Sequence, residues 1–179
     1  MSHAQHEMEA TAAPEIDSAM LRMATQRMRD QQNLSAAVVA GTVAAIVGAG
    51  LWAITTVITG YQIGWMAVGI GFLVGYAIRG VGKGIDQSFA IAGGTLALVG
   101  CMLGNLLTVC YFVAQNEGVA VLDLLPQLDF AIVSELLIAT FSPMDLLFYG
   151  IAVYEGFSLS TVSVSEDALQ GATAGPVIT

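Results

Sequence analysis

Three long uncharged runs dominate the hydrophobic pattern of the chain. They cover Ser35 to Thr59, about Ile63 to Ile78, and about Ser88 to Ala114. A membrane-spanning helix needs about 20 predominantly apolar residues, because each residue adds about 1.5 Å along a hydrocarbon core about 30 Å thick. Backbone groups inside a bilayer must be paired within the chain, and these runs lack the alternating pattern of a membrane barrel. We therefore predict three transmembrane helices.

A fourth predicted span begins after Ser142. Residues 142–145, Ser-Pro-Met-Asp, have the features of a helix start: a Ser as N-cap, a Pro at the first helical position and an acid three residues after the cap. The apolar run that follows is interrupted by Glu155 and reaches spanning length if the helix continues to Val162. We therefore predict an all-α, polytopic helical membrane protein with about four spans, the fourth at residues 143–162.

The segment between the third and fourth spans, residues 119–141, is apolar but broken by Pro126 and Asp129. Its longest unbroken part, residues 130–141, is too short to cross a bilayer, so we predict interfacial or re-entrant helices on the outer side. One alternative stays open, in which Phe130 to Tyr154 form a single span kinked at Pro143. That span would carry three acids into the membrane together: Glu135, Asp145 and Glu155.

The first 34 residues are too polar for a signal peptide, so we expect the first span to remain as an uncleaved anchor. Apolar residues between Pro14 and Asn33 recur at spacings of three and four, which predicts an amphipathic helix. That helix can lie on the inner leaflet, or it can pack on a loop or on a neighbouring subunit. Residues 35–163 form the predicted membrane domain, and residues 164–179 form a loose acidic tail.

The composition favours a membrane protein and excludes other classes. Hydrophobic residues make up 56% of the 179 residues and charged residues 11%, against about 25% charged in soluble domains. The chain has 5 Lys and Arg against 14 Asp and Glu, so it has no basic patch to neutralise the phosphates of a nucleic acid. Two cysteines are too few for a disulfide scaffold.

Every basic residue falls on one side of the predicted topology. Three precede the first span, and two lie between the second and third spans. Cytoplasmic segments are enriched in Lys and Arg, so we predict a multi-pass protein with a cytoplasmic N-terminus. The same five side chains are the predicted contacts to lipid headgroups: Arg22, Arg27, Arg29, Arg79 and Lys83.

Glycines are concentrated in the second and third spans, and two pairs have the G-x-x-x-G spacing. Glycine lets the backbones of two helices approach closely in lipid, so we predict that the second helix packs against the third. Gly69 lies on a different face from the other glycines of its helix and can serve a second subunit. Asn105 is expected to make an interhelical hydrogen bond. The predicted packing residues are Gly64, Gly69, Gly71, Gly75, Gly100, Gly104 and Asn105.

Glu155 is the main candidate for chemistry. A carboxylate at the centre of a span costs roughly 2.5 to 3.5 kcal/mol on insertion scales, and such residues face a partner, a cavity or an ion path. Glu155 is therefore a candidate proton or cation site, with Tyr149 or Tyr154 as a hydrogen-bonding neighbour. The alternative is a position near the inner interface. The sequence contains no metal-binding or catalytic pattern, and residues 80–84 lack the spacing of a phosphate loop.

The block YQIGWMAVGIGFLVGYAIR at residues 61–79, followed by GKGID at residues 82–86, resembles a group of small multi-span bacterial membrane proteins. The similarity extends through residues 100–105 and covers about a third of the chain. No activity is assigned to that group, so no catalytic or binding residue carries over from it. The resemblance implies a bacterial origin, hence the inner membrane, and a shared module made of the second and third spans.

The expected function is that of a non-catalytic membrane protein, a structural or accessory subunit. It would form a homo-oligomer or join a larger membrane complex, with membrane lipids as its other partners. Two alternatives stay open: an ion or proton channel or small-solute transporter that uses Glu155, and a membrane enzyme that acts on lipid or quinone through residues 119–141. We predict no cofactor, no metal and no nucleic-acid partner.

Overall fold

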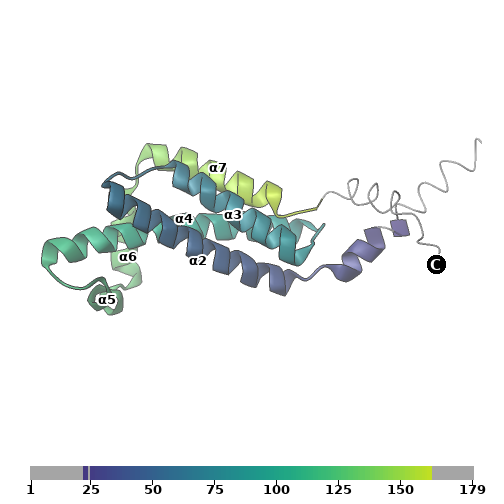
Figure 1. Ribbon diagram of the computed structural model, residues 1–179, viewed down its shortest axis with the longest axis horizontal. Coiled ribbons are helices and arrows are strands. Elements are labelled where there is room, and N and C mark those ends of the chain that lie inside the picture. The colour runs from purple at the N-terminus through teal and green to yellow at the C-terminus, as the bar shows by residue number, and fades with distance from the viewer. Residues whose placement is uncertain (1–21, 24, 163–179) are drawn as a thin grey trace, which may run out of the picture.

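The computed structural model describes residues 22–23 and 25–162 (Figure 1). The predicted helix from Pro14 to Asn33 lies partly outside these residues, and the predicted tail at residues 164–179 lies wholly outside them. The described elements are all helices, with no strand among them, which confirms the all-α prediction. They are α2 (Leu34–Thr59), α3 (Trp65–Gly82), α4 (Gln87–Glu117), α5 (Val121–Leu124), the 3₁₀ helix η1 (Leu125–Gln127), α6 (Phe130–Thr140) and α7 (Pro143–Leu159).

Three helices are long and apolar enough to cross a membrane: α2 with 26 residues, α3 with 18 and α4 with 31. They coincide with the first three predicted spans. Helix α7 has 17 residues and is therefore about 26 Å long. It begins where the sequence predicted but ends at Leu159 rather than at Val162.

Four helices, α2, α3, α4 and α7, lie side by side in one elongated bundle (Figure 1). Helices α3 and α4 contact each other in the middle, and each of them also contacts both α2 and α7. Helices α2 and α7 therefore lie on opposite sides of the α3–α4 pair. The chain runs in one direction in α2 and α4 and in the opposite direction in α3 and α7.

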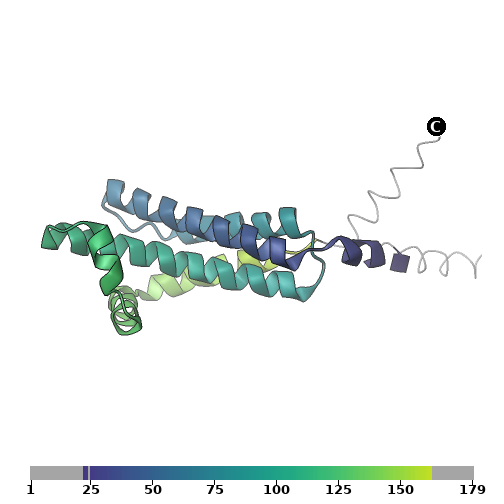
Figure 2. The ribbon, with the colours of Figure 1, turned by 90° about the horizontal axis from the view of Figure 1, so that it is seen from below.

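The two ends of the bundle differ. Residues 83–86 connect α3 to α4 at one end, which we call the loop end. At the other end, which we call the cap end, residues 60–64 connect α2 to α3. Helices α5 and α6, with η1 between them, also lie at the cap end, across the bundle axis (Figures 1 and 2). The start of α2 and the end of α7 both lie at the loop end (Figure 1).

Helix boundaries follow local capping chemistry. The Asn33 side chain caps α2 by accepting a hydrogen bond of 2.9 Å from the backbone N–H of Ala36. Gly60 ends the same helix at φ 70°, a left-handed conformation that glycine adopts without steric cost. Ser142 and Asp145 form the predicted capping box at the start of α7, with Pro143 at the first helical position. The sequence-based prediction of this helix start is confirmed.

The chain turns by 107° between α6 and α7, at residues 141–142. A proline kink bends a helix but leaves it continuous, whereas here the helical hydrogen bonds stop at Phe141. The segment from Phe130 to Tyr154 is therefore two helices rather than one kinked helix. Helix α6 crosses the cap end, and α7 runs back along the bundle (Figure 2).

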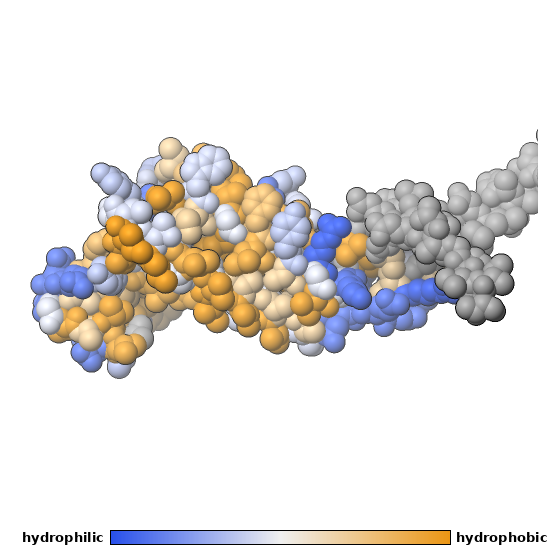
Figure 3. All heavy atoms as spheres, in the orientation of Figure 1, coloured by the Kyte–Doolittle hydropathy of each residue, from blue (hydrophilic) through white to orange (hydrophobic). Residues whose placement is uncertain are grey.

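The bundle has small residues inside and large apolar residues outside. Alanine and glycine fill most of the buried positions, and the few large buried side chains include Trp52 and Phe89. Large apolar side chains are exposed along the long helices, for example Ile46 at 56% and Leu147 at 57%. Figure 3 shows hydrophobic residues over the middle of the bundle and hydrophilic ones toward its two ends. Small interiors and apolar exteriors are typical of helices that pack in lipid.

Candidate functional site

Gly71 and Gly75 of α3 lie at its contact with α7. A Cβ atom at Gly71 would lie 2.5 Å from the carbonyl oxygen of Ala152, and one at Gly75 would lie 2.7 Å from Cβ of Leu159. The predicted packing of the second helix against the third is present, since α3 and α4 contact each other, but this pair of glycines faces α7 rather than α4. The glycine spacing defines a small face but not the helix it meets, because α3 contacts three helices.

The second G-x-x-x-G pair, on α4, packs against α2, and a Cβ at Gly100 would also lie 2.9 Å from the Ile70 side chain of α3. A Cβ at Gly100 would lie 3.3 Å from Cα of Ala45, and one at Gly104 would lie 3.2 Å from Cβ of Trp52. Gly64, at the cap end, lies against the Phe148 ring of α7. These glycines are therefore used within the bundle.

Gly69 is the exception among the glycines predicted to pack. It is exposed, and a Cβ added there would meet no atom within 4 Å. On the same face of α3 lie Trp65, Phe72 and Tyr76, exposed by 69%, 40% and 58%. We call these four residues the Gly69 face. We call the open space beside Gly69, among these aromatic side chains, the notch.

Glu155 lies near the loop end of α7. Its carbonyl oxygen is 3.2 Å from a Cβ built at Gly75, which is one helical turn before Arg79. Two turns after Glu155, the N–H of Val162 donates a 2.9 Å hydrogen bond to the carbonyl of Gly84 in the α3–α4 connection. The Glu155 residue itself is partly buried. This position corresponds to the inner-interface alternative if the loop end faces the cytoplasm.

The two tyrosines named with Glu155 do not join it in a hydrogen-bonded group. The Tyr149 hydroxyl is buried and lies 3.5 Å from the carbonyl of Cys101, to which it donates. Tyr154 is 67% exposed on the outside of the bundle. The structure thus places the three residues in three different environments.

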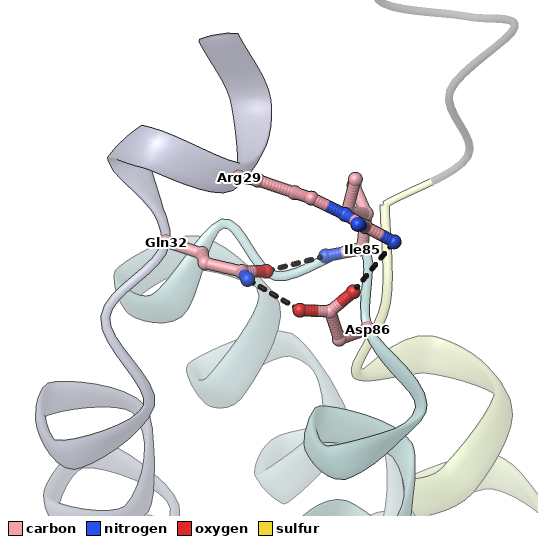
Figure 4. A network of polar contacts seen from close by, with 4 residues as sticks. All are labelled: Arg29, Gln32, Ile85 and Asp86. Atoms are coloured by element: carbon pink, nitrogen blue, oxygen red, sulfur yellow. Dashed lines mark hydrogen bonds and ion pairs between the residues drawn. The ribbon is translucent and has the colours of Figure 1, made fainter. Parts of the chain in front are cut away.

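The five basic residues belong to the segment before α2 and to the end of α3 and its connection to α4. Arg29 pairs with Asp86 at 3.5 Å, and Gln32 hydrogen-bonds both the Asp86 carboxylate and the Ile85 N–H (Figure 4). An ion pair this exposed contributes only about 0–1 kcal/mol, so the contacts position the segment more than they stabilise it. Arg22, Arg27 and Lys83 are exposed, and Arg79 is partly buried.

Asn105 joins three parts of the cap end. It is 2% exposed, and its side-chain carbonyl accepts a 3.3 Å hydrogen bond from the Gln62 amide of the α2–α3 connection. Its amide nitrogen donates a 3.2 Å hydrogen bond to the Thr140 hydroxyl of α6. The predicted interhelical hydrogen bond is confirmed.

Two cavities meet at Asn105. The first, of about 390 Å³, lies between α4, α6 and α7 and is apolar. Besides Asn105, its lining residues are Leu98, Met102, Leu137, Phe141, Leu146, Tyr149, Gly150 and Val153. The second has a volume of about 380 Å³, and we call it the polar cavity because hydroxyl and carboxamide side chains line it. Besides Asn105, its lining residues are Thr56, Gly60, Gln62, Thr108, Val109, Phe112, Val113, Asn116 and Thr140.

The polar cavity contains a buried hydroxyl without a partner. Thr56 is 2% exposed, and its Oγ1 makes no hydrogen bond in the structure. Trp52, one turn earlier on α2, is fully buried, and its Nε1 is also unpartnered. Buried polar groups are nearly always hydrogen-bonded, so an exception is a reason to look for a ligand or water.

Sequence reasoning did not find Thr56 or Thr108. Thr56 follows Thr55, and Thr108 stands among apolar residues; at such positions in a helix a threonine usually bonds its own helix. What brings them together is the register of α2 against α4, which single-sequence patterns do not report. The residues that the structure describes contain no cluster of three or more His, Cys, Asp or Glu that could hold a metal ion.

Comparison of the chain with protein-family models, curated proteins and solved structures finds no match. The resemblance of residues 61–79 to a bacterial group therefore stays a prediction.

Proposed function

We propose that the chain is a four-span integral membrane protein of the bacterial inner membrane that acts as a structural or accessory subunit. The packing of α7 along α3 and α4 supports its assignment as the fourth span. The basic residues of the segment before α2 and of the α3–α4 connection support a cytoplasmic loop end and N-terminus. In this role the protein associates with copies of itself or with other membrane proteins rather than catalysing a reaction.

The observation that carries this proposal is the Gly69 face. Glycine inside a helix costs roughly 0.5–1 kcal/mol relative to alanine, and the other predicted packing glycines offset that cost through close helix contacts. Gly69 has no such contact within the chain. A helix of a second subunit that enters the notch between Trp65 and Phe72 would supply it.

The test is the Gly69→Leu variant, which adds a side chain where a Cβ would meet no atom within 4 Å. Native mass spectrometry and chemical cross-linking in mild detergent measure the associated fraction. We expect the native protein to associate and Gly69→Leu to reduce that association about tenfold. Gly150→Leu is the matched control, because Gly150 also has open space but lies on α7 at the apolar cavity. A native protein that is strictly monomeric and copurifies with nothing would contradict the proposal.

Transport is the second candidate function, and the partial burial of Glu155 on a predicted span favours it. Flux of protons or cations through reconstituted liposomes, compared between the native protein and Glu155→Gln, tests it. A transport role requires that the variant lose most of the flux. If neither protein shows flux, or if both show the same flux, Glu155 has no role in transport.

A further inference from the structure

The polar cavity has a buried floor and an exposed mouth. Thr56, Asn105 and Thr108 form its floor, and each is at most 6% exposed. Gly60, Gln62 and Asn116 are exposed and lie where α2 ends and α4 approaches its end. The cavity therefore opens at the cap end of the bundle and leads toward the core.

The Thr56 hydroxyl differs from comparable threonines of the bundle. Thr42 and Thr59 of the same helix donate to the carbonyls of Val38 and Thr55, each at 2.8 Å. Thr108 on the opposite wall donates to the carbonyl of Gly104 at 2.9 Å. Thr56 has the same option four residues back but does not use it. Thr56 thus lines the cavity with a buried hydroxyl that has no partner in the structure.

The lining selects for an uncharged ligand. Its polar side chains are hydroxyls and carboxamides, which both donate and accept hydrogen bonds, and none of its lining residues carries a charge. An ion entering this cavity would lose hydration without gaining an opposite charge. A hydroxyl-bearing group, which also donates and accepts, matches the lining.

The rest of the lining of the polar cavity is apolar, and the volume of the cavity suits a ligand with one small ring. Val109, Phe112 and Val113 of α4 line one side, and Phe112 is 42% exposed. A cyclic polyol has C–H faces for these apolar side chains and hydroxyls for the polar side chains of the lining. The volume of about 380 Å³ lies in the range of roughly 300–1,000 Å³ for small-molecule sites and far exceeds the roughly 30 Å³ of one water.

We propose that this cavity binds a neutral polyol, either a free one or the uncharged head of a membrane lipid, with Thr56 and Asn105 as its buried hydrogen-bonding partners. The ligand enters from the cap end, past Gln62 and Asn116. This site is separate from the Gly69 face, so either proposal can fail without the other.

The test uses photoreactive glucosides and the full chain in phosphatidylcholine nanodiscs, which contain no polyol head. One probe carries a methyl group on the sugar and represents a free polyol; the other carries a diacylglycerol and represents a lipid. Mass spectrometry maps the labelled residues. We expect labelling at residues 105–116 by at least one probe, and the probe that labels identifies the source of the ligand. Photoreactive phosphatidylglycerol, which adds a negative charge to a polyol head, should label these residues at least tenfold less.

Thr56→Val is the decisive variant because it removes only the unpartnered hydroxyl. Such a replacement is close to neutral for stability, so the variant is expected to fold. It should reduce labelling about five- to tenfold, the loss expected for one hydrogen bond. Thr42→Val on the same helix is the matched control and should label like the native protein. Gln62→Leu, at the exposed mouth, should also weaken labelling.

Three results would overturn the proposal. They are the absence of labelling at residues 105–116 with both glucosides, unchanged labelling in Thr56→Val, and equal labelling by the anionic lipid. The first result would indicate that the cavity holds water only. The other two would indicate contact with lipid in general rather than a built site.

Discussion

Gly69 and Gly71 lie two residues apart on α3 and have opposite surroundings. The backbone of α7 closes off the space beside Gly71, whereas Gly69 faces outward. An alanine placed at either position is the same substitution on the same helix, at nearly the same height along the bundle axis. The stabilities of the two variants can therefore be compared directly.

We predict that Gly71→Ala lowers the free energy of unfolding by about 1–3 kcal/mol, because the new methyl group forces α3 and α7 apart. Gly69→Ala should leave it unchanged or raise it by up to about 1 kcal/mol, the difference in helix propensity. Unfolding of the purified protein in mild detergent, followed by circular dichroism, measures both. Equal stability of the two variants would contradict the packing of α3 on α7.

These residues also show which packing features can be predicted from a single sequence and which cannot. The G-x-x-x-G spacing correctly marked Gly71 and Gly75 as packing residues, because spacing alone places two residues on one helix face. It did not identify α7 as the helix that this pair meets, because α3 contacts three helices. Thr56 was not found, since its significance depends on the helices around it.

The ends of the helices were more predictable than the contacts between helices, because capping depends on residues that are close in the sequence. The start of α7 followed from Ser142, Pro143 and Asp145, and the structure shows the capping box that these residues imply. The break before α7 was less predictable. A Pro at the first position fits a helix start as well as a kink, and the 107° turn depends on how α6 packs on the cap end.

At this scale we predict that Ser142→Ala destabilises the protein by about 1 kcal/mol, the usual value of an N-cap side chain. The hydroxyl of Ser142 accepts from the N–H of Met144, and a methyl group leaves that donor without its partner. Ser158→Ala, at an exposed position on the same helix, is the control and should have little effect. Thermal unfolding in detergent compares the two, and a similar loss in both variants would argue against the cap.

For the whole molecule, the distribution of basic residues predicts which end faces the cytoplasm. Both native cysteines, Cys101 and Cys110, are buried, so an introduced cysteine can report its own accessibility. We predict that Gln127→Cys at the cap end reacts with a membrane-impermeant maleimide in intact cells from which the outer membrane has been removed. Gln87→Cys at the loop end should react only after the inner membrane is opened. The reverse pattern would invert the topology.

The α3–α4 connection also has a consequence for the order in which the protein assembles. The carbonyl of Gly82 accepts from the N–H of Asn33 at 3.0 Å, and that of Gly84 accepts from the N–H of Val162 at 2.9 Å. A chain made from its N-terminus completes the α3–α4 hairpin long before it reaches Val162. The hairpin is therefore available as a template when α7 arrives. Both acceptors are backbone carbonyls, so this last closing step does not depend on the exposed side chain of Lys83, whereas a Cβ added at Gly84 would meet the Phe89 ring.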